Sequence, residues 1–190
     1  LTGLHTAGRV LGQLYQTRHF TERRSGPEPV YQYHALFRDF LMAQARQRLA
    51  AAELRTVQQA AAELLEGAGH IDAAVVLLET AGRTDELLRI ALAHAPSLMA
   101  EGRAQTLEGW LRKIPVPHLA SVPWGLFWLG TCTCLTNHDE GQRLLERAFK
   151  GFQQNGDRAG MLSASCGIVE SIMATWVNMP TLGDWVEQLR

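Results

Sequence analysis

Repeated signals for ending one helix and starting the next constrain the fold of this 190-residue chain more than any other feature. The segment 66–72 reads EGAGHID, and the segment 79–85 reads ETAGRTD after a shift of 13 residues. Gly69 and Gly82 can adopt the left-handed conformation that ends many helices. This punctuation predicts short antiparallel helices joined by tight turns.

Aspartates follow these glycines at positions suited to capping the next helix. Asp72 and Asp85 can accept hydrogen bonds from the free amide groups of a first helical turn. The segments Asn137–Asp139 and Asn155–Asp157 offer the same chemistry between two apolar periodic stretches. We therefore expect helix starts at all four places.

From about residue 50 the chain shows no comparable strand signal, and strong helix formers (Ala, Leu, Glu, Gln and Arg) predominate. Helices joined by short turns bury their apolar faces by stacking side by side. The sequence predicts a mainly α fold, an α-solenoid of tetratricopeptide-like antiparallel helix pairs. The expected helices, counting the one that begins at Ala35, span residues 35–49, 52–67, 72–81, 85–95, 104–113, 124–136, 139–154, 157–176 and 181–190.

The first 49 residues show a different pattern of helix, hairpin and helix. Residues 7–18 have helical apolar spacing, and segments 19–23 and 30–33 have strand character. Between them lies the turn-rich stretch RSGPEP at 24–29, which contains two prolines and a glycine. The helix over 35–49 carries one apolar face, formed by Leu36, Phe37, Phe40, Leu41 and Ala45.

The segment 124–156 resembles a tetratricopeptide repeat. Trp128-Leu129-Gly130 lies in its first helix, Ala148 lies in its second, and an Asn-Gly-Asp turn follows.

The run VYQYHALFRDFL at 30–41 resembles a signature of signal-transduction ATPases related to the maltose-regulon activator, transcriptional regulators with LuxR-type DNA-binding ends. In that family the motif closes a winged-helix module that precedes a superhelical repeat domain. The stretch GWLRKIP at 109–115 resembles a segment of the helical part. The resemblance implies that residues 1–49 are the C-terminal part of a winged helix, and that residues 50–190 are a helical sensor domain truncated at its C-terminus.

The resemblance also implies a function. The chain is expected to be a non-catalytic sensor fragment of an ATP-dependent bacterial regulator. The implied partners are the ATPase core and DNA-binding domain of the same polypeptide, and an inducer, either a small molecule or a protein. Inducer binding in the helical repeats would favour an ATP-bound, self-associating form.

The net charge and the absence of certain motifs exclude some functions for this segment. The formal net charge is −1, so no basic field attracts nucleic acid or an anionic membrane. The phosphate-binding pattern GxxxxGK[ST] is absent from the sequence, and so is a recognisable basic helix-turn-helix. We expect no cofactor in this segment and no direct contact with DNA.

Three cysteines at 132, 134 and 166 are too few for a secreted disulfide framework, which favours a reducing cytoplasm. The most apolar stretch, 122–135, is too short to span a membrane. The first residue is not Met, and the last residues have the pattern of a helix, so we expect that both ends continue in a longer chain.

Four residues of the motif are candidates for contact with another domain: Tyr31, Tyr33, His34 and Phe37. Core packing of the winged module explains the aromatic residues equally well. His34 is a candidate pH switch, and a packed histidine bonded to backbone is the alternative.

Four tryptophans in the helical part are candidates for a ligand or partner surface, because indoles stack on sugars, planar ligands and helices. Packing between helical layers is the alternative for each. They are Trp110, Trp124, Trp128 and Trp176.

Two other functions compete with the regulator. A free-standing helical-repeat adaptor explains the repeats but needs neither the hairpin nor the Tyr-x-Tyr-His run. An enzyme would need a reactive cysteine. A metal site at Cys132, Cys134 and His138 is disfavoured, because residues two apart on a helix point about 200° from each other.

Overall fold

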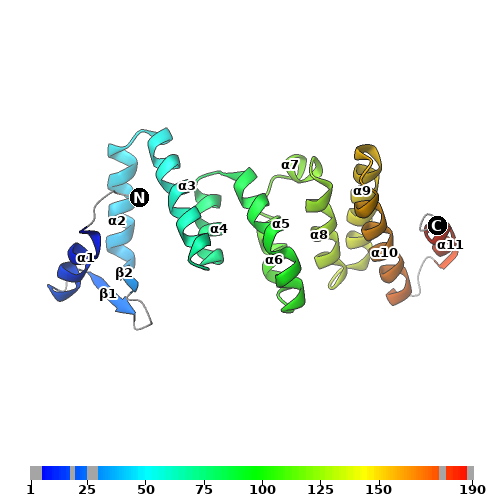
Figure 1. The fold of residues 1–190 in the computed structure, drawn as a ribbon, viewed down its shortest axis with the longest axis horizontal. Coiled ribbons are helices and arrows are strands. Elements are labelled where there is room, and N and C mark those ends of the chain that lie inside the picture. The colour runs from blue at the N-terminus through cyan, green and yellow to red at the C-terminus, as the bar shows by residue number, and fades with distance from the viewer. Residues whose placement is uncertain (1–5, 18–19, 25–29, 176–178, 188–190) are drawn as a thin grey trace. The chain divides into compact units, whose positions relative to one another are not determined.

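The computed structural model describes residues 6–17, 20–24, 30–175 and 179–187 (Figure 1). The chain divides into two compact units, Leu1–Gly69 and His70–Arg190, called unit 1 and unit 2 below. Across the described residues, none of the helices combines the length and the apolar character needed to cross a membrane.

Unit 1 contains the predicted order of helix, hairpin and helix. The strands pair antiparallel, with Thr21 opposite Tyr33 and Arg23 opposite Tyr31. Residues 18 and 19, expected at the end of the first helix and the start of the hairpin, lie outside the described residues. The elements are α1 (Ala7–Gln16), β1 (Thr21–Arg24), β2 (Val30–Tyr33), α2 (Ala35–Arg48) and α3 (Ala51–Gly67).

The apolar face predicted on α2 is present but not buried. No residue of α2 is buried, and Leu36 and Phe40 are 76% and 56% exposed. Among the described residues of unit 1, only Thr21, Gln58 and Ala62 are buried. The aromatic side chains of unit 1 are therefore ordered but not buried.

Unit 2 consists of helices in antiparallel succession. Each predicted helix is found within a few residues of its expected bounds where these are described, except that α5 extends beyond residue 95 to Ala100. The predicted ends at residues 176 and 190 lie outside the described residues. The helix α7, flanked by Pro115 and containing Pro117, was not predicted. The elements are α4 (Ile71–Thr80), α5 (Thr84–Ala100), α6 (Ala104–Leu111), α7 (Val116–Ala120), α8 (Pro123–Cys134), α9 (His138–Asn155), α10 (Arg158–Thr175) and α11 (Met179–Glu187).

The predicted glycine stops are confirmed. Gly69 and Gly82 have φ values of 79° and 66°, in the left-handed region that favours glycine. At the end of α4, the Arg83 amide donates to the Leu78 carbonyl at 2.9 Å and the Gly82 amide donates to the Glu79 carbonyl at 3.0 Å. These bonds satisfy carbonyls that would otherwise be left free at the helix end.

The predicted capping roles of Asp72 and Asp85 are wrong. Helices α4 and α5 begin one residue earlier, and their N-caps, His70 and Arg83, make no side-chain cap bond. Both carboxylates contact side chains farther along the chain instead: Asp72 forms an ion pair with Arg103 at 3.2 Å, and Asp85 lies 2.9 Å from Nε2 of His118. At the later turns the capping prediction is confirmed, since Asn137 accepts from the Glu140 amide at 3.1 Å, and Asp157 accepts from the Gly160 amide at 2.9 Å.

Helix α5 runs through Pro96, although proline removes a backbone donor and usually ends or bends a helix. Ala95 is fully buried and Leu98 is 4% exposed on the two sides of this proline. Burial of these side chains favours continuation of the helix, which explains why it extends beyond the predicted end at residue 95.

Close packing of α8 against α9 follows from three glycines. A Cβ at Gly141 would lie 2.6 Å from the Cys134 backbone nitrogen, and one at Gly130 would lie 3.1 Å from the Gly141 carbonyl oxygen. A Cβ at Gly151 would lie 2.7 Å from Pro123 Cγ, at the other end of the pair. These contacts show that the two helices are antiparallel and nearly touch, as the repeat-like pattern of 124–156 predicts.

Each helix of unit 2 from α4 to α10 contributes buried apolar side chains. The largest fully buried side chains of this unit include Leu78, Ile90, Leu107, Leu145 and Phe152. The predicted fold class, a mainly α chain of helix pairs preceded by a hairpin-containing module, is confirmed. The domain boundary after residue 49 stays a prediction.

Candidate functional site

Trp110 lies inside unit 2. It is 6% exposed on α6, beside the fully buried Leu107 and Leu111. Its position supports the packing interpretation rather than a place on a ligand surface.

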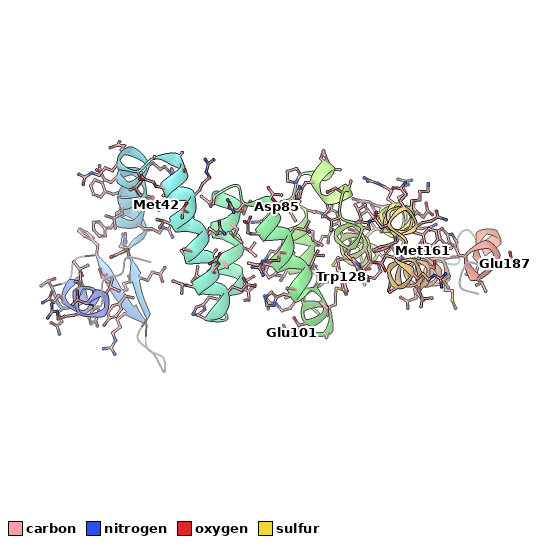
Figure 2. The ribbon with its side chains drawn as sticks, turned by 45° about the horizontal axis from the view of Figure 1, so that its top comes forward. Met42, Asp85, Glu101, Trp128, Met161 and Glu187 are labelled. Carbon is pink, nitrogen blue, oxygen red and sulfur yellow. The ribbon has the colours of Figure 1, made fainter. Side chains whose placement is uncertain are left out.

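Trp124 and Trp128 are partly buried on α8 and differ in their contacts; Figure 2 labels Trp128. The Trp124 indole donates from Nε1 to Asp157 Oδ2 at 3.1 Å, and its ring meets Phe152 edge to face at 4.9 Å. Trp128 contacts the Phe127 ring at 5.1 Å. Trp176 lies outside the described residues. Of the three candidate tryptophans that are described, Trp110 is buried, whereas Trp124 and Trp128 both contact the Phe127 ring.

Asp157 was not singled out as a contact between helices. One carboxylate oxygen caps α10 while the other accepts from Trp124 on α8. Its turn sequence, Asn-Gly-Asp, predicts the cap, but the bond to an indole 33 residues away depends on the tertiary structure.

The motif of unit 1 forms an aromatic patch, defined here as Phe20, Tyr33, Leu36, Phe37 and Phe40. Phe37 is at its centre: its ring lies 5.7 Å from Phe20, 5.4 Å from Tyr33 and 6.4 Å from Phe40, measured between centroids. Leu36 lies one helical turn before Phe40. Phe20, Leu36 and Phe40 are each more than half exposed, so the patch is an ordered apolar surface.

The four predicted interdomain residues have different positions around this patch. Tyr33 and Phe37 belong to it, whereas Tyr31 packs against Tyr15 at 6.4 Å. The His34 side chain is exposed, so the alternative of a packed histidine is wrong. Its backbone amide donates to the Phe20 carbonyl at 2.7 Å, which joins the two halves of the patch.

Phe20 adopts a strained backbone. Its φ is 50°, in a region that bulky residues rarely occupy and that costs on the order of 1 kcal/mol or more. This conformation presents a 64%-exposed ring that stacks on Phe37. Strained backbone conformations cluster at functional sites, so Phe20 is a candidate contact residue.

Unit 2 contains a pocket of about 310 Å³, called the helix-end pocket below. It lies where the C-terminal turns of α5, α8 and α10 meet the start of α9. Its wall combines apolar with polar side chains: Met99, Thr131, Cys134, Leu135, His138, Leu145, Gly167, Glu170, Ser171 and Ala174.

Hydrogen-bonding groups in this wall have distinct environments. Nδ1 of His138 is buried and has no hydrogen-bond partner among the described residues. Burial raises the pKa of the Cys134 thiol, while a bond with Ser171 acts in the opposite direction. Glu170 is exposed at the edge of the pocket. The sequence offered no signal for this site, because its lining comes from four helices.

The cysteines do not form a metal centre with His138. Cys132 is buried, with its sulfur 3.6 Å from Met99 Sδ, and burial raises its pKa to about 12. Among the described residues, no group of three metal-binding side chains converges on one point.

A charged network that the sequence analysis missed joins three helices. Arg112 contacts Glu108 at 2.8 Å and Glu140 at 3.2 Å, and Thr133 donates to Glu108 at 3.3 Å. The hydrogen bond to Glu108 is the main cause that raises the pKa of Arg112. This network connects the end of α6 with α8 and α9, and its role is structural.

Residues 1–53 match the family model described as the MalT winged helix domain. The match covers the hairpin, α2 and the aromatic patch. It confirms the resemblance of this module to regulators related to the maltose-regulon activator. No curated protein and no solved structure matches the chain.

Proposed function

We propose that this chain is a non-catalytic regulatory segment of an ATP-dependent, cytoplasmic transcriptional regulator of the LuxR-ended type. Unit 1 supplies the end of a winged helix, and unit 2 is the first part of a sensor domain that binds an inducer. The ATPase core and the DNA-binding domain lie elsewhere in the same polypeptide.

One observation carries this proposal: a MalT-type winged helix over residues 1–53 is followed directly by antiparallel helix pairs. A free-standing helical adaptor has no need of a winged helix at its start. The order of the two modules is the order that the family resemblance implies.

The aromatic patch is the surface through which unit 1 contacts the ATPase core. Exposed apolar side chains gain about 25 cal/mol per Å² when another surface covers them. Three side chains of the patch are more than half exposed, and the strained Phe20 is one of them. Such a contact would hold the nucleotide-binding core in its resting state.

Unit 2 provides the surface on which an inducer acts. An inducer shifts the equilibrium between resting and active forms only by its difference in affinity for the two. The helix-end pocket lies between helices of successive pairs, so a bound molecule can change how these pairs pack. The active form would bind ATP and self-associate.

The first test is the reading frame around the segment that encodes residues 1–190. An upstream phosphate-binding loop and a downstream helix-turn-helix would support the proposal. A frame without either would contradict it and leave the helical-repeat adaptor, which should then be tested for peptide binding.

The second test uses the full-length regulator. Phe40→Ser in the aromatic patch should raise inducer-independent ATPase activity, because it weakens the restraining contact. Val57→Ser is the matched control, since Val57 is 46% exposed on α3 and is not part of the patch. Equal basal activity in both variants would contradict the role of the patch.

A further inference from the structure

We propose that the helix-end pocket binds a small organic cation, a molecule with an ammonium group on a compact apolar body. This inference deepens the proposed function, on which its regulatory meaning rests, by naming the chemical class of the inducer. The binding itself is a property of unit 2 and is measured separately.

The first argument is the electrostatic character of helix ends. Met99 lies in the last turn of α5, Cys134 ends α8, and Ala174 lies in the last turn of α10. The C-terminus of a helix carries a partial negative charge, and a basic residue in the last turn usually offsets it. None of these three helices has a basic residue in its last turn. The C-terminal turns of three helices therefore contribute residues to one pocket, and the partial negative charge of each end is not offset by a basic residue in its own last turn.

The second argument is the set of hydrogen-bonding side chains. Glu170 is the charged side chain among the described lining residues, and its carboxylate is an acceptor. Buried Nδ1 of His138 has no partner among the described residues, and in one neutral tautomer it is also an acceptor. An ammonium group has donors and no acceptor, so it complements both.

The opposing helix end does not cancel this field. Helix α9 begins at His138 and directs its positive end toward the pocket region, but Asp139 and Glu140 lie in its first turn. Asp139 offsets part of the partial positive charge of that end, whereas Glu140 is already paired with Arg112 at 3.2 Å. No lysine or arginine lines the pocket among the described residues.

The apolar part of the wall accounts for the body of the ligand. Met99, Leu135 and Leu145 supply apolar surface, and Leu135 is 65% exposed. A volume of about 310 Å³ is at the lower end of the range for small-molecule sites, about 300–1,000 Å³. A dinucleotide is too large for this volume, and the apolar side chains suit a ring with a short amine chain better than the many hydroxyl groups of a sugar.

The experiment compares three probes of similar shape on the purified 190-residue chain: 2-phenylethylamine, 2-phenylethanol and 3-phenylpropanoate. Binding is followed by NMR chemical-shift titration. We expect the amine to bind most tightly and the carboxylate least. Equal affinities, or tighter binding of the carboxylate, would overturn the assignment of a cation. No binding of any probe would overturn the site.

Two variants locate the site. Glu170→Gln should lower amine affinity about threefold to fivefold and leave the alcohol unchanged, as expected for loss of a solvent-exposed ion pair. Glu187→Gln on α11 is the control, because this exposed carboxylate does not line the pocket. An equal loss in both variants would overturn the role of Glu170.

Ala174→Trp places a bulky side chain at the pocket from an exposed position and should abolish binding of the amine and the alcohol. Retained binding in this variant would overturn the location. The probe series on the unaltered chain decides the charge preference even if a variant fails to fold. If the pocket binds cations but the reading frame encodes no flanking ATPase, the proposed function is refuted and the proposal of a cation-binding site stands.

Discussion

Units 1 and 2 use apolar side chains in opposite ways. In unit 2 the large apolar residues are enclosed: Leu145 is 1% exposed and Ile168 is fully buried. In unit 1 the comparable residues are ordered but uncovered, with Leu36 at 76% and Phe40 at 56%. Ala62 is the one buried hydrophobic residue described in unit 1. A regular apolar pattern therefore predicts a helix equally well in both units, but only in unit 2 does it identify a core.

This difference shows that the two units are stabilised in different ways. An enclosed core stabilises its own unit, whereas an ordered apolar surface gains its stabilisation when a partner covers it. The following predictions test this contrast on the isolated chain.

The largest effect is expected from removal of a core side chain. Leu145→Ala should lower the free energy of unfolding of unit 2 by about 3 to 5 kcal/mol, through lost burial and a cavity. Leu36→Ala in unit 1 should cost less than about 0.5 kcal/mol, as is usual for an exposed position. Urea denaturation followed by circular dichroism measures both. Similar losses would show that unit 1 has a core of its own.

Thiol reactivity tests whether the core of unit 2 is closed. Cys132 should react with iodoacetamide at least about a hundredfold more slowly than exposed Cys166 at pH 8, because it is buried and its pKa is about 12. Mass spectrometry of timed samples gives both rates. Comparable rates would contradict a closed core, and a hyper-reactive cysteine would revive the enzyme alternative.

The same thiol predicts a direction for alkaline stability. The folded-state pKa of Cys132 is raised from 9.0 to about 12, so the unfolded chain loses this proton first as pH rises. The contribution of the protonated Cys132 thiol to the free energy of unfolding is fully present below pH 9 and is lost between about pH 9 and pH 12. Cys132→Ala should flatten the fall in stability over that window.

A smaller loss of stability is expected from adding a Cβ where two helices touch at a glycine. Gly141→Ala should cost about 1 to 3 kcal/mol, because the added Cβ would lie 2.6 Å from the Cys134 backbone nitrogen and α8 and α9 would have to separate. Gly109→Ala is the matched control: nothing lies within 4 Å of its Cβ, so it should stabilise α6 by about 0.5 to 1 kcal/mol. If both substitutions stabilise the protein, the predicted close contact is wrong.

The smallest effect concerns one hydrogen bond. Trp124→Phe should cost about 1 kcal/mol more than Trp128→Phe, because it removes the donor to Asp157. Thermal unfolding compares the two variants. Equal losses would assign the effect to ring volume alone.

Local patterns in the sequence were sufficient for much of the fold. The stops at Gly69 and Gly82, the hairpin and the winged-helix motif depend on residues within one or two turns of each other, where backbone geometry and capping act. These features are confirmed by positive φ values, strand pairing and the family match. Periodicity also gave the helices of unit 2, because their apolar faces share one core.

The tertiary structure decided what lies far apart along the chain. Asp72 pairs with Arg103 and Asp85 lies beside His118, so neither caps its own helix, and Pro96 stays helical because its neighbours are buried. The helix-end pocket and the Trp124–Asp157 bond join segments tens of residues apart. A local pattern shows which side of a helix is apolar, but burial, charge pairing and cavities depend on the surfaces that meet it. For this protein, the sequence by itself determined the order of its elements, and the packing of those elements determined its candidate sites.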